Sequence, residues 1–448
     1  MRYLPKSPSE RREMLAAIGA RSVEKLFESI PEKFRLHEPL PLPGPLSEME
    51  IIAYFQARAA ENARGYTSFL GAGVYPHLRS VVTDALVQRG EFLTSYTPYQ
   101  AEISQGTLTA IFEFQTLMCQ LTGQEVANAS MYDGSTALTE AVLMAERLAG
   151  RHRVLIARSV HPEYRQVLAT YARNLGLEIE EIGFTESGQL DRAALAPERL
   201  AAACAVVVQS PNFFGILENI PALADAAHSG DALLITSIAE PISLGIVRPP
   251  AEADIVAMEG QAFGVPPSYG GPYVGVVATR DKFVRQMPGR LAGQTTDAAG
   301  RRGFVLTLAT REQHIRREKA TSNICTNEAL YALTATIHLC LLGKEGIREL
   351  AAQNLSKARF AQAELEKIPG VRRVFSGPTF NEFTLEFPRS VKLINAALLR
   401  EKIIGPFALG THYPELTKRA VVCVTETMPR PEIERMAAAV RRILETPI

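Results

Sequence analysis

Short apolar runs alternate with amphipathic helical patterns through the middle of this 448-residue chain, between about residues 60 and 300. The apolar runs occupy residues 153–160, 177–184, 202–211, 232–240, 253–259 and 273–280. Helical spacing of apolar residues occurs at 135–149, 162–175 and 222–230, before or between these runs. Near-continuous apolar strands that alternate with helices predict a mostly parallel sheet, covered by helices on both faces.

The regions on either side of this core have a different character. Residues 1–60 are proline-rich and contain two capping boxes, one from Ser7 to Glu10 and one from Ser47 to Glu50, each of which predicts the start of a helix. A long helical pattern covers 327–343, and a helix is predicted over 356–368, followed by further strands. We therefore predict four regions: an N-terminal arm (1–60), a large domain (61–300), a connecting segment with the long helix (301–349) and a small C-terminal α/β domain (350–448).

Charge and composition exclude several classes of protein. Lys plus Arg equals Asp plus Glu, at 48 each, and no basic block occurs, so neither a nucleic-acid groove nor a polybasic membrane patch is indicated. No run of about 18 apolar residues could span a bilayer, and the beginning of the chain lacks the apolar region of a signal peptide. The five cysteines are scattered without a CxxC pair, as is typical of free thiols in a reducing compartment. We expect a cytoplasmic protein.

Sequence motifs narrow the chemistry. A dinucleotide fingerprint, a P-loop, HExxH and GxSxG are all absent, which excludes several common enzyme classes. The small-residue turn at 133–137, which includes Ser135 and Thr136, opens directly into a helix. Free N–H groups and hydroxyls at a helix N-terminus suit a phosphate. An ordinary N-cap by Asp133 or Ser135 is the equally good alternative.

Three further polar residues follow predicted strands. His161, in SVHPEYR, could stack on an aromatic cofactor, and Glu240, in IAEPISLG, could pair with a pyridinium nitrogen. Gln261 precedes a Gly/Pro-rich loop and a return strand. Each residue also has a simpler explanation: His161 could be a hydrogen-bonding residue of a loop, Glu240 a loop carboxylate, and Gln261 part of a simple turn. Together, however, the four features follow the order found in fold-type-I pyridoxal-phosphate enzymes, to which this region is similar.

The position of Gln261 is the important departure from that pattern. In the family it resembles, a lysine near this position forms the covalent bond to the cofactor. There is no lysine between Lys33 and Lys282, although the chain carries eleven lysines in all. The predicted large domain therefore has almost no primary amine that could form a Schiff base.

A closer resemblance covers nearly the whole chain. It is carried by the stretches 66–77, 91–108, 128–138, 160–165, 259–272, 300–327 and 380–383, especially the run TREQHIRREKATSNICT. These resemble the amino-terminal subunit of the split glycine decarboxylase family, the P-proteins of the glycine cleavage system. The resemblance implies the fold-type-I transferase fold, with a mostly parallel seven-stranded sheet in the large domain plus the small α/β domain.

The same resemblance implies the reaction and the partners. Pyridoxal phosphate would be attached to a second subunit, the homologue of the carboxy-terminal half, in an α2β2 assembly. Glycine would be decarboxylated there, and the aminomethyl group would pass to the lipoyl arm of the H-protein, with a functional link to the T-protein and the L-protein. No nucleic acid or membrane is expected. Ser135, Thr136, His161, Glu240 and Gln261 would then form a vestigial cofactor pocket.

Residues 96–106 are our main candidates for a contribution to the partner's active site. They are Tyr96, Tyr99, Gln100, Ser104 and Gln105, which offer donors to a phosphate or a substrate carboxylate. The loop 69–77 could approach a substrate, and the basic group Arg311, His314, Arg316 and Arg317 is expected on a helix face that bonds the partner chain. Two other readings stay open: a partner that only stabilises a pyridoxal enzyme, and a stand-alone aminotransferase-like enzyme that uses a lysine from elsewhere.

Overall fold

The computed structural model describes residues 6–38, 40–94 and 96–446, which divide into two compact units, one ending at Arg64 and the other beginning at Gly65. The first unit contains α1 (Pro8–Ala17), two 3₁₀ turns (Glu24–Phe27 and Glu32–Phe34) and α2 (Glu48–Ala60). Both predicted capping boxes are confirmed, because each cap serine accepts from a backbone N–H while the glutamate three residues on accepts from the serine N–H. None of the described residues of this unit is buried.

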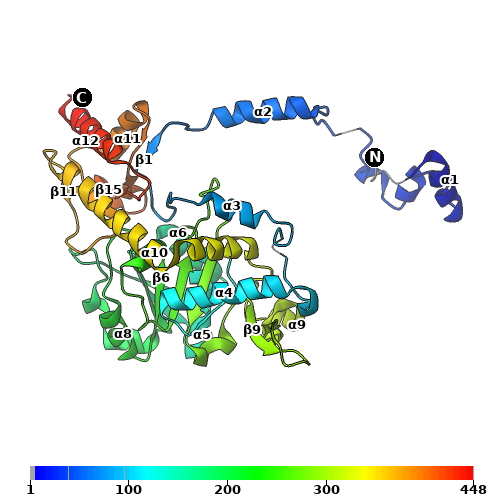
Figure 1. Cartoon of the computed structure of the whole chain (residues 1–448), viewed down its shortest axis with the longest axis horizontal. Helices are drawn as coiled ribbons and strands as arrows, with labels where there is room; N and C mark the ends of the chain where they lie inside the picture. The colour runs from blue at the N-terminus through cyan, green and yellow to red at the C-terminus, as the bar shows by residue number, and fades with distance from the viewer. Residues whose placement is uncertain (1–5, 39, 95, 447–448) are drawn as a thin grey trace. The chain divides into compact units, whose positions relative to one another are not determined.

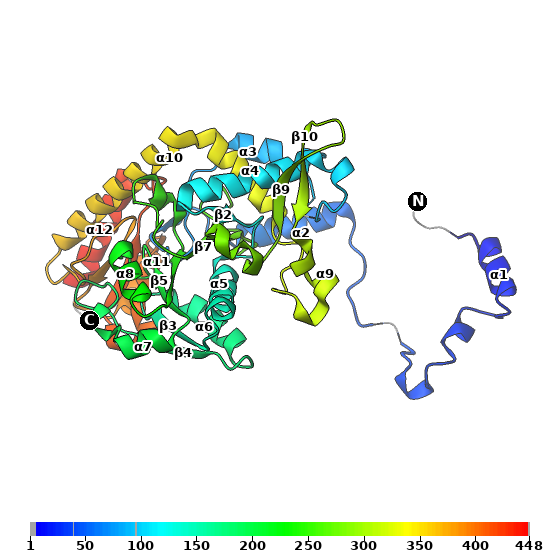
Figure 2. The ribbon, with the colours of Figure 1, turned by 90° about the horizontal axis from the view of Figure 1, so that it is seen from below.

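A seven-stranded sheet forms the centre of the second unit (Figures 1 and 2). Its strands are β2 (Val126–Ala127), β3 (Arg153–Ala157), β4 (Glu178–Ile182), β5 (Ala205–Gln209), β6 (Leu233–Ile238), β7 (Ile255–Glu259) and β8 (Gly275–Thr279). They lie in the order β2-β8-β7-β6-β5-β3-β4. The strands from β7 to β4 are parallel, whereas β8 runs antiparallel to both of its neighbours. The predicted mostly parallel sheet is confirmed.

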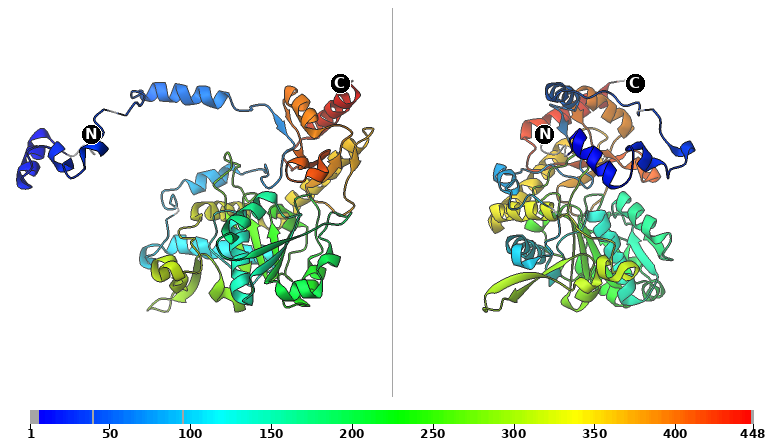
Figure 3. Two further views of the ribbon diagram at one scale, coloured as in Figure 1. Left: turned by 180° about the vertical axis from the view of Figure 1, so that it is seen from behind. Right: turned by 90° about the vertical axis from the view of Figure 1, so that its right-hand side faces the viewer.

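Helices cover both faces of this sheet (Figure 3). They include α4 (Gln105–Thr122), α5 (Gly134–Ala149), α6 (Pro162–Ala172), α7 (Pro197–Ala202) and α8 (Ile220–His228), whereas α3 (Val81–Val87) packs against the long helix of residues 329–366. Strands β5, β7 and β8 are buried along their whole length, which explains why their sequences are apolar without alternation. Because the parallel strands end at one edge, the loops that follow β3, β6 and β7 converge there.

The C-terminal part builds a second, smaller layer. A four-stranded antiparallel sheet orders β11 (Arg372–Arg373), β12 (Glu382–Glu386), β15 (Arg419–Cys423) and β14 (Phe407–Ala408). Helices α11 (Val391–Arg400) and α12 (Arg430–Glu445) share a separate hydrophobic core with this sheet. Strand β1 (Thr67–Ser68) pairs in parallel with β13 (Ile403–Ile404), so the start of the second unit is bound to its C-terminal part.

Two features differ from the sequence-based expectation. An antiparallel hairpin, β9 (Leu291–Thr296) with β10 (Arg302–Thr307), occupies a region that the apolar pattern did not mark as strands. The two helices expected at 327–343 and 356–368 are present as the two parts of α10 (Ala329–Glu366), which meet at a kink at Gly343, so the second helix begins directly after this kink rather than at 356. Among the helices of the described residues, none has the length and hydrophobicity needed to cross a bilayer.

Candidate functional site

The four predicted features lie at the carboxyl edge of the large sheet, and one segment of the chain connects three of them. Gly71–His77 follows β1 and contacts in turn His161 through Ala72, Gln261 through Tyr75 and Glu240 through His77. Beside this segment lies a cavity of about 320 Å³, lined among others by Gly73, Ser135 and His161. The sequence placed these residues at strand ends correctly, but it did not predict that a loop of the same chain would lie among them.

Carboxylates of this chain bind the first N–H groups of α5. One oxygen of Asp133 accepts from the N–H groups of Ser135 (2.7 Å) and Thr136 (3.0 Å), so the N-cap alternative is confirmed. The carboxylate of Glu259 accepts from the Gly134 N–H at 2.8 Å. Burial raises the pKa of Glu259 to about 8, although the N–H groups of Gly134 and Gln261 favour the ionised form. The backbone donors that would cradle a phosphate are therefore already bonded.

His161 is buried as a neutral ring. Its ring stacks on that of Tyr164, with centroids 4.8 Å apart and an interplanar angle of 27°. Nδ1 accepts from the Glu163 N–H at 3.2 Å, so Nε2 carries the proton and donates it to the Ala72 carbonyl at 2.9 Å. Burial lowers the pKa of His161, which agrees with this tautomer. One face of the ring is thus covered by Tyr164, while the main chain of Gly73 lies against its Nε2 edge.

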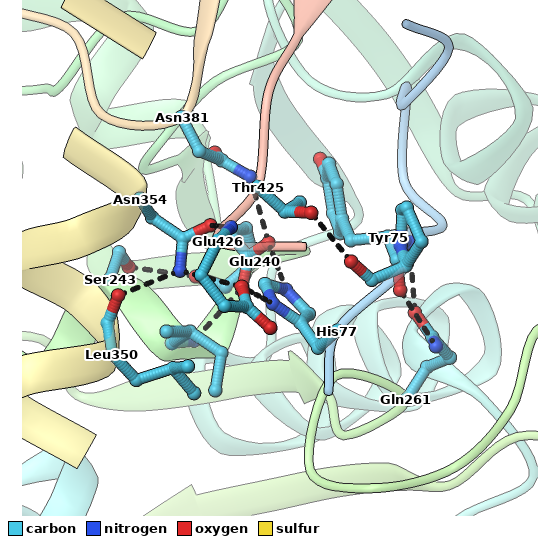
Figure 4. Close-up of polar contacts among 12 residues, drawn as sticks. Tyr75, His77, Glu240, Ser243, Gln261, Leu350, Asn354, Asn381, Thr425 and Glu426 are labelled. Atoms are coloured by element: carbon cyan, nitrogen blue, oxygen red, sulfur yellow. Dashed lines mark hydrogen bonds and ion pairs between the residues drawn. The ribbon is translucent and has the colours of Figure 1, made fainter. Parts of the chain in front are cut away.

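Glu240 forms an ion pair with a histidine (Figure 4). The side chain of His77 is 2% exposed and lies between two carboxylates, with Nε2 2.9 Å from Glu240 and Nδ1 2.8 Å from Glu426. Asn381 donates to the same oxygen of Glu240 at 2.9 Å. Burial disfavours the charged ring, but Glu240 and Glu426 outweigh burial and raise the pKa of His77 to about 10. His77 is therefore a buried imidazolium at neutral pH.

The amide of Gln261 is bonded on all sides by backbone. Its oxygen accepts from the Tyr75 N–H at 3.0 Å, and its nitrogen donates to the Tyr75 carbonyl at 3.1 Å (Figure 4). The same nitrogen also donates to the Val265 carbonyl at 2.7 Å. The Tyr75 hydroxyl in turn donates to Glu382 at 2.8 Å. Gln261 thus holds the segment Gly71–His77 against the sheet edge.

These contacts test whether the pocket of this chain fits pyridoxal phosphate. No amine is present at Gln261, Glu240 already has a cationic partner, and the first α5 N–H groups already have the carboxyl oxygens of Asp133 and Glu259 as acceptors. The described lining of the adjacent cavity contains no Lys or Arg but includes Asp133, Glu163, Glu259 and Glu328. A phosphate dianion there would meet carboxylates of like charge. The residues do not fit the cofactor, and this argues against the stand-alone aminotransferase-like reading.

The tyrosine segment forms a separate cluster around a buried arginine. Arg290 is 2% exposed, pairs with Glu312 at 2.9 Å and donates to the Tyr99 hydroxyl at 2.6 Å. It also bonds Thr97 and the carbonyl of Cys325. The Tyr96 ring meets the Tyr99 ring edge to face at 6.0 Å, and 68% of Tyr96 is exposed. The cluster thus presents two tyrosines at the surface on an arginine-based support.

The other residues of 96–106 differ in their bonding. Gln105 uses both hydrogens of its amide on the carbonyls of Ala101 (2.7 Å) and Phe304 (2.8 Å), and its oxygen accepts from the Phe304 N–H. It therefore holds the edge of β10. The side chains of Gln100 and Ser104 make no hydrogen bond within residues 6–38, 40–94 and 96–446. Their polar groups are available to a partner or ligand.

The expected helix face of basic residues is wrong. Helix α9 (Gln313–Arg316) is a single turn, and Arg317 follows it with a positive φ of 53°. Arg311 points inward and donates to the carbonyls of Leu308, Met287 and Gly289. The ring of His314 packs on Tyr99 at 5.7 Å, so it extends the tyrosine cluster.

Sequence reasoning missed His77, Glu259 and Arg290 as site residues. His77 ends the stretch FLGAGVYPH, which was quoted only as a loop that could approach a substrate. Glu259 is the last residue of β7, two positions before Gln261, where a charged group at the end of a buried strand was a usable signal. Arg290 has no sequence signal, because its partners come from segments far apart in the chain.

Comparison with known proteins agrees with this geometry. The family described as glycine cleavage system P-protein matches residues 1–440. A probable glycine dehydrogenase (decarboxylating) subunit 1 from Koribacter versatilis is 55% identical over 98% of this chain and all of that protein. A crystal structure of glycine decarboxylase (P-protein) of the glycine cleavage system, in inhibitor-bound form, has a TM-score of 0.91 and 43% identity, covering 99% of this chain and all of that one.

A more distant structure supports the fold alone. A sphingosine-1-phosphate lyase from Burkholderia pseudomallei has a TM-score of 0.66 at 18% identity, over 92% of this chain and 93% of that one. The architecture is the fold-type-I arrangement of pyridoxal-phosphate enzymes, as the sequence predicted. The family match and the identities establish that this chain belongs to the glycine cleavage system P-protein family.

Proposed function

We propose that this chain is subunit 1 of a two-chain glycine dehydrogenase (decarboxylating), and that it acts by completing an active site on a second subunit. Family membership and full-length similarity to proteins of that name support the assignment. The observation that carries the division of labour is Gln261, whose amide is bonded to the Tyr75 and Val265 backbone where a cofactor lysine would be needed. The chain by itself is then inactive.

The partner in this proposal is the homologue of the carboxy-terminal half, in an α2β2 heterotetramer in the cytoplasm. Pyridoxal phosphate on the partner supplies the electron sink that lets glycine lose CO2. The aminomethyl group forms a bond to one sulfur of the oxidised lipoyl disulfide of the H-protein, and the other sulfur takes up a proton. The T-protein and the L-protein would then process the loaded arm.

The tyrosine cluster is this chain's contribution to that site. Tyr96 and Tyr99 are exposed on one surface, and Gln100 and Ser104 follow them with polar groups that can donate to an anion. Arg290 fixes the Tyr99 hydroxyl by donating to it, so that the hydroxyl hydrogen of Tyr99 points elsewhere and can be given to a carboxylate or phosphate oxygen. Gln105 supports the segment from behind through β10.

A second function is favoured by one observation. Because Tyr99 is already bonded to the buried Arg290, the cluster can also be a purely structural part of the subunit interface. In that case this chain stabilises the partner without touching the substrate. The two proposals differ in what happens when a hydroxyl is removed but the ring is kept.

Replacing Tyr96 and Tyr99 by phenylalanine tests this difference in the assembled complex. Loss of a hydrogen bond made to the substrate is expected to lower glycine-dependent CO2 exchange with H-protein by about 10-fold or more, since one such bond to a charged group is worth about 1.5–3 kcal/mol. Tyr171→Phe, on the outer helix α6, is the matched control and should leave the rate unchanged. Full exchange activity in an intact Tyr96→Phe, Tyr99→Phe complex, as judged by size-exclusion chromatography, would reject the catalytic contribution and favour the structural one.

A further inference from the structure

We propose that Gly71–His77, together with Glu259, is a built-in occupant of the vestigial pocket, which replaces the cofactor's polar contacts with contacts from the protein itself. The pocket would then be closed to pyridoxal phosphate even if an anchoring lysine were restored. This goes beyond the proposed function, which requires only that the cofactor be bound elsewhere.

The first argument concerns the ring nitrogen. Glu240 is 1% exposed, and its position was predicted to pair with the pyridinium of a bound cofactor. A buried carboxylate requires a cationic or strongly donating partner. Nε2 of His77 supplies this partner at 2.9 Å, and Nδ1 of the same ring is held by Glu426 on the C-terminal part (Figure 4). An aromatic N–H cation of this chain therefore satisfies Glu240 in place of the cofactor's.

The second argument concerns the phosphate. The Gly134 N–H points at Glu259, and the next two N–H groups of α5 point at Asp133. Asp133 supplies a negative charge at the positive end of the helix dipole, and Glu259 supplies the acceptor for the remaining N–H, both from within the chain. The approach is tight, because a Cβ built on Gly134 would lie 2.8 Å from the Cβ of Glu259 and 2.5 Å from the Tyr164 hydroxyl. Gly134 therefore packs directly against Glu259 and Tyr164.

The third argument concerns the segment that carries His77. It is bonded along its length: the Ala72 N–H donates to Glu382 (2.7 Å), Tyr75 exchanges two hydrogen bonds with Gln261, and Thr425 donates to the Pro76 carbonyl (2.6 Å). These hydrogen bonds come both from Gln261, which follows a strand of the large sheet, and from Glu382 and Thr425, which belong to the C-terminal part. A segment held at so many points is a permanent part of the fold rather than a lid that a ligand displaces.

Restoring the lysine tests the proposal in the complete complex with the partner subunit. Gln261→Lys is co-expressed with subunit 2, incubated with pyridoxal phosphate and reduced with borohydride, and the pyridoxyl adducts are located by peptide mass spectrometry. We expect an adduct on subunit 2 and none on the substituted peptide of this chain. An adduct at position 261 at a level comparable to that on subunit 2 would overturn the proposal, while the proposal of a partner-borne cofactor would stand.

A second variant asks whether the named residues are the cause. Gln261→Lys combined with His77→Ala and Glu259→Ala removes the two occupants and should gain the adduct. A complex that assembles normally but gains none would overturn the assignment to these residues. If the combined variant does not assemble, the single substitution still decides, because it keeps His77 and Glu259, the two side chains that bond Glu240 and the first turn of α5.

Discussion

The pair of carboxylates around His77 allows a quantitative prediction about stability. In His77→Gln the ring cation is lost, and Glu240 and Glu426 remain buried without a counter-charge. Removing one member of a buried ion pair costs about 3–5 kcal/mol, because the remaining charge is left unsolvated. Unfolding entropy near 60 °C is about 2.1 cal/mol/K per residue, so for a unit of roughly 400 residues the thermal midpoint should fall by about 4–6 °C.

The pH dependence gives the sign of the effect. The pKa of His77 is raised from 6.5 to about 10, so its stabilising contribution is complete below about pH 6.5 and is lost as pH rises through about 10. The variant lacks this contribution at every pH. The difference in midpoint between the wild-type chain and His77→Gln should therefore be large near neutral pH and shrink toward pH 10. The facing groups Glu240, Glu426, Arg79 and His338 are the same in both proteins.

The assay is differential scanning calorimetry of the assembled complex between pH 6 and pH 10. His228→Gln is the matched control, because its ring pairs with Asp254 at 2.7 Å but is 43% exposed. Exposed pairs contribute about 0–1 kcal/mol, so the control should shift the midpoint by about 1 °C or less. A His77→Gln midpoint as close to wild type as that of the control, or a difference that grows toward pH 10, would refute the reasoning.

Two other outcomes follow from the same site. The pKa of Glu259 is raised from 4.5 to about 8 in the folded chain, so the loss of its proton destabilises the folded state increasingly as pH rises from 4.5 to 8. In Glu259→Gln this group no longer titrates, and the thermal midpoint should therefore fall less steeply over that pH range. Gly134→Ala should lower the midpoint by several degrees, because the added Cβ would lie 2.5 Å from the Tyr164 hydroxyl; Gly183→Ala, which meets nothing within 4 Å, should not. A flat response in the first case, or equal midpoints for the two alanine variants, would contradict the geometry.

The order of elements could be predicted from sequence because it depends on local patterns. Between their end residues, the strands β3, β5, β6 and β7 are apolar except for Thr236 and Ser237, and hydrophobic periodicity identifies such runs directly. Once the strands were identified, the positions of His161, Glu240 and Gln261 at one edge of the sheet could also be predicted, because residues that follow parallel strands share that edge. The hairpin β9–β10 was missed because its exposed half, including Gln294 to Thr296, is polar and carries no apolar alternation.

The bonding partners of those residues could not be predicted in this way. His77 lies 163 positions before Glu240 and 349 before Glu426, so their contact depends on how distant segments fold together. The same holds for Arg290, which bonds Tyr99 across 191 positions. The lysine gap, in contrast, was visible by counting, because the absence of an amine requires no knowledge of contacts.

A lost lysine is not enough to explain the pocket. In a chain with Gln261 but without His77, Asp133 and Glu259, Glu240 would be buried with no cation and the first α5 N–H groups would have no acceptor, and each of these states costs several kcal/mol. The chain has a partner for each group: His77 for Glu240, and Asp133 and Glu259 for α5. The polar groups of the pocket are therefore explained by the stability of a cofactor-free fold, whereas the exposed tyrosines are not. In the function that we propose, these tyrosines are the part of this chain that contributes to the active site of the second subunit.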